Sequence, residues 1–280
     1  MNPQKNRNKF FLKFFPFKFF LIVFTGIIFS ACKTSDSDLI RKADDEALNQ
    51  RAQLAKYLYI QVLQNRSNRD ELRFRALEGL AEVSSTQLFD YPAAIKAIEI
   101  ILEEFGRDAL FRDRTTAWRL RAAQIYRTHF QKYERALQIL EPLSLDTNAN
   151  SEVLQEVAKN YLSIRKFSEA TFFLKKAWDK APTSKNCNLF RSLQMDMIQT
   201  FSLDKKCDQA IDWIQKKLPA ACKPDSFSLA FEEAHCFESG NEIQRAIKIY
   251  EDIIKAQPSN SRAHFLLESI KKRQREKQIR

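Results

Sequence analysis

Histidine and cysteine are the side chains from which this sequence could most readily build a catalytic or metal site. The three histidines, His129, His235 and His264, form no HExxH motif and no pair spaced by four residues. His235 adjoins Cys236, but consecutive helical residues point about 100° apart, so the two side chains do not face one site. The chain also lacks the GxSxG, GxxxxGK[ST] and GxGxxG motifs. We therefore expect no enzyme activity, no metal and no cofactor.

Cysteine chemistry depends on the compartment that the chain enters. Apart from Cys32, the sequence contains Cys187, Cys207, Cys222 and Cys236, at spacings that do not match a CxxC-type zinc site. Disulfides persist in an oxidising compartment, where four cysteines can pair in three ways. The N-terminal residues indicate which compartment applies.

Residues 1–31 have the composition of a secretory signal peptide. Five basic residues precede or enter an apolar run that covers 19–31, and the first acidic residue is Asp36. These 13 residues would form a helix of ~20 Å at ~1.5 Å per residue, which is shorter than the ~30 Å hydrocarbon core of a bilayer. We therefore expect this segment to be cleaved rather than to span a membrane.

The end of the apolar run resembles a bacterial lipobox. The tetrapeptide is Phe29-Ser30-Ala31-Cys32, with Phe29 where family members usually carry leucine. The resemblance implies that Cys32 receives fatty chains and becomes the N-terminus, and two or more chains suffice for stable attachment. Lys33 in place of aspartate favours sorting to the outer membrane by the same resemblance. The alternative is an ordinary signal peptide in which Cys32 has no special role.

The remaining residues contain an internal repeat. When Ala170 is aligned with Ala246, Ala158 meets Ala234 without a gap, and the matched prolines that end both segments also coincide. This pattern resembles the tetratricopeptide repeat, in which small residues let two antiparallel helices cross closely and proline stops the second helix. A rival helical bundle would share the 3.6-residue periodicity but would not explain the matched alanine, aromatic and proline positions.

The resemblance implies an all-α fold: a right-handed superhelix of antiparallel helix pairs, or α-solenoid. We expect repeat units near 39–66, which is degenerate, and at 70–106, 112–145, 151–184, 188–222 and 227–260. A signal peptide at 1–31 and a polar linker at 32–38 precede this 39–270 domain, which a capping helix at 261–270 closes. A basic tail at 271–280 follows, and we expect it to be the solvated end of that helix.

The repeat pattern selects one pairing of the cysteines. Cys187 precedes the first helix of a unit and Cys222 follows its second helix, so the two ends are neighbours in an antiparallel hairpin. Cys207 begins that second helix, and Cys236 lies in the next unit beside it. We therefore expect the disulfides Cys187–Cys222 and Cys207–Cys236, with four unpaired thiols as the alternative.

Charge and repeat register together suggest the kind of partner. The formal charge is +11, but the signal peptide and the tail hold most of the excess, so the body gives no electrostatic footprint for nucleic acid. In the repeat family, certain positions of each first helix face a concave groove, which suits a peptide or a partner helix. These positions are occupied here by Leu120, Gln124, Arg127, Gln155, Lys159, Met195, Gln199, Phe231, His235 and Glu238.

These features together predict a lipid-anchored scaffold that faces the periplasm and binds other envelope proteins or peptides through the groove. Its architecture is similar to that of the repeat lipoproteins of outer-membrane barrel assembly and of type IV pilus biogenesis. Two alternatives remain: a structural envelope protein whose repeats bind further copies of the chain, and a hydrolase carried on a repeat scaffold.

Overall fold

The computed structural model describes residues 35–64, 70–147, 149–182, 187–220, 222–223 and 225–279, without the side chains of 277–279. All regular structure in these ranges is helical. The predictions made for the signal peptide and for the acylation of Cys32 lie outside the described residues.

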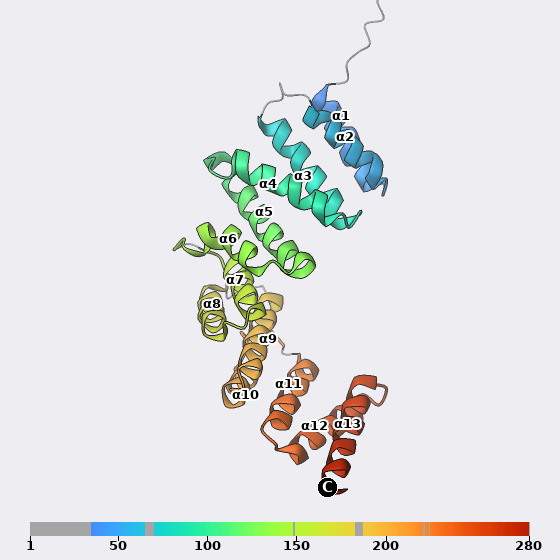
Figure 1. Cartoon of the computed structure of the whole chain (residues 1–280), viewed down its shortest axis with the longest axis vertical. Helices are drawn as coiled ribbons and strands as arrows, with labels where there is room; N and C mark the ends of the chain where they lie inside the picture. The colour runs from blue at the N-terminus through green and yellow to red at the C-terminus, as the bar shows by residue number, and fades with distance from the viewer. Residues whose placement is uncertain are drawn as a thin grey trace, which may run out of the picture. The chain divides into compact units, whose positions relative to one another are not determined.

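The helices follow one another as antiparallel pairs, and each helix packs against its neighbours along the chain (Figure 1). The pairs are α1 (Asp36–Leu48) with α2 (Ala52–Gln64), α3 (Asp70–Thr86) with α4 (Tyr91–Phe105), α5 (Arg112–Ile125) with α6 (Tyr133–Ser144), α7 (Ser151–Ser163) with α8 (Phe167–Lys180), α9 (Cys187–Leu203) with α10 (Cys207–Gln215), and α11 (Ser226–Ser239) with α12 (Ile243–Ala256). The short η1 (Ala109–Phe111) precedes α5, a π-helical turn η2 (Tyr126–Phe130) extends it, and α13 (Ser261–Ile279) follows the last pair.

Small residues occupy the contact between the helices of each pair. The second helix of every pair places an alanine there that is fully buried, with 0% of its surface exposed: Ala55, Ala94, Ala136, Ala170, Ala210 and Ala246. A larger side chain at these positions would push the two helix axes apart. The close packing therefore follows directly from the alanine pattern of the sequence.

The turn inside every pair contains one residue in the left-handed backbone region. These residues are Gln50 (φ 61°), Phe89 (φ 52°), Gln131 (φ 53°), Arg165 (φ 59°), Lys205 (φ 61°) and Asn241 (φ 64°). Glycine is the usual residue for this conformation, since a Cβ is disfavoured there. The regular recurrence of the strained residue is a second signature of the repeat, independent of the alanines.

Two boundaries differ from the sequence predictions. The unit expected to be degenerate at 39–66 is a complete helix pair that begins at Asp36, because Ile40 and Ala43 supply the buried face of its first helix. The capping helix does not end at residue 270 but continues to Ile279. The basic residues of the tail therefore extend from a helix, where Arg273 pairs with Glu238 and Lys271 with Glu251.

The fifth pair is closed by a disulfide. Cys187 and Cys222 are bonded, with a Cα–Cα distance of 5.2 Å, and this is the pairing that the antiparallel hairpin predicts. The second predicted disulfide is absent, since Cys207 and Cys236 are free thiols. The two thiols are in contact, and burial followed by the hydrogen bond to Cys236 raises the pKa of Cys207 to about 12.

Candidate functional site

The first helices of successive pairs form one face of the described solenoid. Contacts join α1 to α3, α5 to α7, α7 to α9 and α9 to α11 directly, in addition to the contacts within pairs. The groove residues predicted from the sequence belong to these first helices, from α5 and its extension η2 to α11. We call it the first-helix face.

In the centre of the first-helix face, ionic side chains bind each other. Arg127 donates from Nε to Oε1 of Glu156 at 2.6 Å and from Nη2 to Oε2 at 3.2 Å. The Glu156 side chain is only 4% exposed. The buried Asn160 also donates to Glu156, through Nδ2 to Oε1 at 3.3 Å. Arg127 is therefore paired within the chain, where it links η2 to α7.

We call the contact between the first helices of consecutive pairs a seam. Polar side chains also join the seam between α7 and α9. Gln155 Nε2 donates to Oγ of Ser192 at 2.6 Å and to Oδ2 of Asp196 at 2.5 Å, while Lys159 Nζ lies 3.4 Å from the same Asp196 oxygen. Burial raises the pKa of the Asp196 carboxyl, and the charge of Lys159 opposes that shift only in part. Gln155 and Lys159, predicted to face a partner, are therefore engaged within the chain.

A pocket of about 380 Å³ opens at the C-terminal end of the first-helix face, and we call it the C-terminal pocket. It is lined by Gln199, Ser202, Leu203, Phe231, Glu232, His235, Glu238, Tyr250, Arg262 and Leu266, which include four of the predicted groove residues. Here α9, α11, α12 and α13 bring together residues from 199 to 266.

The C-terminal pocket has a rigid floor and a more open rim. The guanidinium of Arg262 lies 4.5 Å from the centre of the Phe231 ring, which is itself buried. Tyr250 donates from its hydroxyl to Oε1 of Glu238 at 2.7 Å, and Arg273 donates to Oε2 at 2.6 Å. Burial, followed by the hydrogen bond to Glu238, raises the pKa of Tyr250 above its ordinary value. His235, which also lines the pocket, is exposed.

The other predicted groove residues lie outside the C-terminal pocket. Leu120 is half-buried and packs against the core that surrounds Phe74, and Met195 packs in the same manner against the core of the fifth pair. Gln124 is half-buried on α5. Apart from Gln124, the groove positions of the repeat family thus have three different environments in this chain: paired with a residue of the neighbouring repeat, packed against a core, or lining a pocket.

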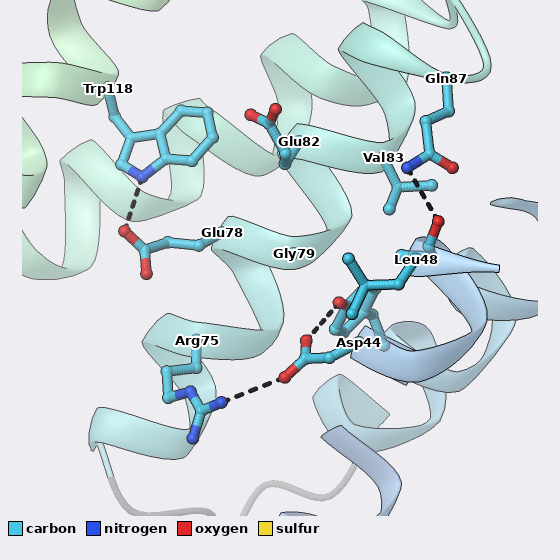
Figure 2. A pocket seen from close by; sticks show the side chains of 11 residues that line it. Asp44, Leu48, Arg75, Glu78, Gly79, Glu82, Val83, Gln87 and Trp118 are labelled. Carbon is cyan, nitrogen blue, oxygen red and sulfur yellow. Dashed lines mark hydrogen bonds and ion pairs between the residues drawn. The ribbon is translucent and has the colours of Figure 1, made fainter. Parts of the chain in front are cut away.

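A second pocket, which the sequence did not reveal, lies at the N-terminal end of the same face. It measures about 550 Å³ and is lined by Asp44, Ala47, Leu48, Tyr59, Arg75, Glu78, Gly79, Glu82, Val83, Gln87 and Trp118. Figure 2 shows the side chains of α1 and α3 meeting here, with Trp118 of α5 as one wall. We call it the N-terminal pocket.

Hydrogen bonds fix the walls of the N-terminal pocket. Tyr59 donates from its hydroxyl to Oδ1 of Asp44 at 2.6 Å, and Arg75 donates to Oδ2 at 3.2 Å. The indole Nε1 of Trp118 donates to Oε1 of Glu78 at 2.8 Å (Figure 2). The one sequence signal was glycine: a Cβ at Gly79 would lie 2.2 Å from Cζ of Tyr59, so α2 can approach α3 this closely only at a glycine.

Two other kinds of feature are absent from the described residues. No helix among them is both long and apolar enough to cross a bilayer. No group of three or more histidine, cysteine, aspartate or glutamate side chains in the same ranges is arranged to hold a metal ion.

Comparison with known proteins identifies the fold. No family description and no curated sequence matches the chain. Among solved structures, PilW, described as a widely conserved type IV pilus biogenesis factor, gives a TM-score of 0.60 with 12% identity over 83% of this chain and 98% of its own. PilF of Pseudomonas aeruginosa gives 0.55 with 15% identity over 84% and 97%. MamA gives 0.51 with 15% identity over 65% and 97%.

At these identities the comparison speaks to the fold alone. The predicted class is confirmed: the chain is an all-α solenoid of the tetratricopeptide-repeat type.

Proposed function

We propose that this tetratricopeptide-repeat solenoid is a protein-interaction scaffold of a bacterial cell envelope, held at the membrane by acylated Cys32 and facing the periplasm. The observation that carries the proposal is the C-terminal pocket, where side chains from two consecutive first helices converge on an open cavity. A pocket formed by several repeats suits an extended protein segment, which contacts successive helices in turn.

The cell-envelope setting draws on two further features. The lipobox-like Phe29-Ser30-Ala31-Cys32 supplies a route to the membrane, and one of the structural neighbours, PilW, is described as a type IV pilus biogenesis factor. We therefore propose assembly of an envelope structure such as a pilus as the process served, with the outer membrane as the site.

Site-specific crosslinking in living cells tests the binding face. A photoreactive p-benzoylphenylalanine replaces His235 in one strain and Lys248 in the control strain; Lys248 is exposed on α12, outside the pocket. We expect one discrete adduct, identified by mass spectrometry as an envelope protein, from position 235 only. Equal adducts at both positions, or an adduct that contains only this chain, would contradict a scaffold for other proteins.

Fractionation tests the anchor separately. We expect the Cys32→Ser chain to leave the membrane fraction and to lose labelling by radioactive palmitate, while retaining the helical circular dichroism of the native chain. The matched control, Ser35→Ala, changes a nearby polar residue outside the lipobox and should leave both properties intact. Unchanged membrane attachment of Cys32→Ser would eliminate the lipid anchor.

A further inference from the structure

The N-terminal pocket has an excess of negative charge. Its lining contains the three carboxylates of Asp44, Glu78 and Glu82 but only one cation, Arg75. Asp44 and Glu78 are already paired, with Arg75 and Arg114. Across the described residues no hydrogen bond or ion pair satisfies the Glu82 carboxylate, which is exposed. The pocket therefore presents one uncompensated negative charge to whatever enters it.

Apolar and aromatic surface flanks that charge. The indole of Trp118 forms one wall, and Figure 2 shows the Glu82 carboxylate on the side of the pocket that faces it. Leu48, at the end of α1, is 83% exposed at the opposite edge. The hydrogen bond from the indole Nε1 to Glu78 holds the ring of Trp118 in position at the pocket.

This combination selects a particular ligand chemistry. An anion would meet the excess of carboxylates, and a purely apolar group would leave Glu82 desolvated without a partner. A guanidinium or ammonium can lie against an indole face while donating hydrogen bonds to a carboxylate, and arginine suits both contacts because its fork is planar. The exposed Leu48 favours an aliphatic residue beside that cation.

We propose that the N-terminal pocket binds a basic side chain, with arginine preferred, of an extended segment in a partner protein, and that an aliphatic neighbour of this arginine covers Leu48. The inference rests on the proposed scaffold function and adds the chemistry of the partner. The Glu82 carboxylate accepts hydrogen bonds from the guanidinium, Trp118 stacks on it, and Asp44 and Glu78 supply the surrounding negative potential.

The indole resonance of Trp118 provides a direct measurement. The full chain, labelled with ¹⁵N and purified in detergent micelles, is titrated with acetyl-Arg-Leu-amide and, separately, with acetyl-citrulline-Leu-amide, which is isosteric but uncharged. We expect the indole N–H signal of Trp118 to move only with the arginine peptide. Trp178 and Trp213, which pack on each other at 5.1 Å in another core, serve as internal references.

Two glutamate variants provide the matched control. Glu82→Gln removes the unpaired carboxylate, and we expect it to weaken binding of the arginine peptide about tenfold, as the loss of a charge-assisted hydrogen bond implies. Glu103→Gln makes the same change on the exposed side of α4, outside the pocket, and should leave binding unchanged. Equal shifts with both peptides, or equal weakening by both variants, would overturn the proposal.

Sedimentation separates the partner from a second copy of this chain, whose helix α13 carries basic residues of its own. We expect the full chain in micelles to sediment as one copy at all concentrations. Self-association that Glu82→Gln abolishes would make a second copy the occupant and would overturn the assignment to another protein. Failure of peptide binding while the crosslink from position 235 persists rejects this inference alone, whereas loss of that crosslink rejects the scaffold function itself.

Discussion

The centre of the first-helix face and its N-terminal end contain similar polar residues but use them in opposite ways. In the centre, Arg127 and Glu156 bind each other across a seam, and Gln155 and Asp196 do the same across the next. At the N-terminal end, an acidic cavity stays open beside Trp118. The same scaffold thus pairs its polar side chains across the contact between helices in one region and leaves the Glu82 carboxylate exposed beside a cavity in another.

The comparison teaches that a groove position does not by itself define a binding residue. Whether a polar side chain is available depends on how far the neighbouring first helix lies and which residue that helix presents. In the centre of the face, complementary side chains lie within the distance of an ion pair or hydrogen bond. At its N-terminal end, the Glu82 carboxylate has no such partner among the described residues.

The largest effect should come from breaking the central ion pair. Arg127→Met would leave Glu156, 4% exposed, as a buried carboxylate that retains only its hydrogen bond from Asn160. Removing one partner of a buried pair typically costs about 3–5 kcal/mol. We expect a loss of that order in the free energy of unfolding, measured by urea denaturation followed by circular dichroism.

An exposed pair supplies the matched control for that experiment. Arg135 binds Glu99 at 3.2 Å, but both side chains are more than two-fifths exposed, at 49% and 43%. We expect Arg135→Met to cost about 0–1 kcal/mol, the usual range for surface pairs. Equal losses in the two variants would remove the distinction between a closed centre and an open surface.

Adding a side chain at Gly79 should disturb the packing of the N-terminal pocket. The Cβ of Gly79→Ala would overlap the ring of Tyr59, which must then move and release its hydrogen bond to Asp44. Overpacking costs about 1–3 kcal/mol, and the better helix propensity of alanine offsets about 1 kcal/mol of that cost. We expect a net loss of about 1–3 kcal/mol in the free energy of unfolding when the lost hydrogen bond is included.

The control for Gly79→Ala is Gly240, a glycine whose surroundings leave space for a Cβ. A Cβ at Gly240 would meet only backbone oxygens at 3.5 Å and beyond, which is ordinary contact. Gly240→Ala should therefore leave stability nearly unchanged in the same denaturation series. A loss comparable to that of Gly79→Ala would mean that the close approach of Tyr59 does not determine the sensitivity.

Two glutamines at predicted groove positions test the comparison side by side. Gln155→Leu removes the donor to Ser192 and Asp196, and we expect it to cost about 1–2 kcal/mol because the half-buried acceptors lose a partner. Gln199→Leu changes a half-buried residue that lines the C-terminal pocket, and we expect little change in stability. Thermal unfolding measures both; a reversed order would show that Gln155 is the residue available for a ligand.

The sequence predicted the fold because the alanine rule is local. The positions of Ala170 and Ala246 require a small residue because two helices cross there, so the repeat could be found from the sequence alone. The disulfide between Cys187 and Cys222 was predictable for the same reason, since the ends of one hairpin are always neighbours.

The pockets and the seams were not predictable in this way. The bond from Gln155 to Asp196 joins residues 41 positions apart in different repeats, and its formation depends on the exact rotation between units. The left-handed turn residues were missed as well, because positions such as Gln131 and Lys205 carry none of the glycine that usually marks them.

The smallest expected effect concerns the charge buried in the α7–α9 seam. Burial raises the pKa of Asp196 above 3.8, its value when unfolded, so the folded chain binds this proton more tightly than the unfolded chain. Stability from this group is therefore present at low pH and is lost as pH rises through the raised pKa.

Asp196→Asn isolates this dependence because other carboxylates titrate equally in both proteins. As pH falls from about 7 towards about 4, we expect the stability of the native chain to rise relative to Asp196→Asn and then to level off. A difference that shrinks towards low pH would mean that Lys159 and Gln155 outweigh burial, and that the closed centre stabilises the ionised carboxylate rather than tolerating it.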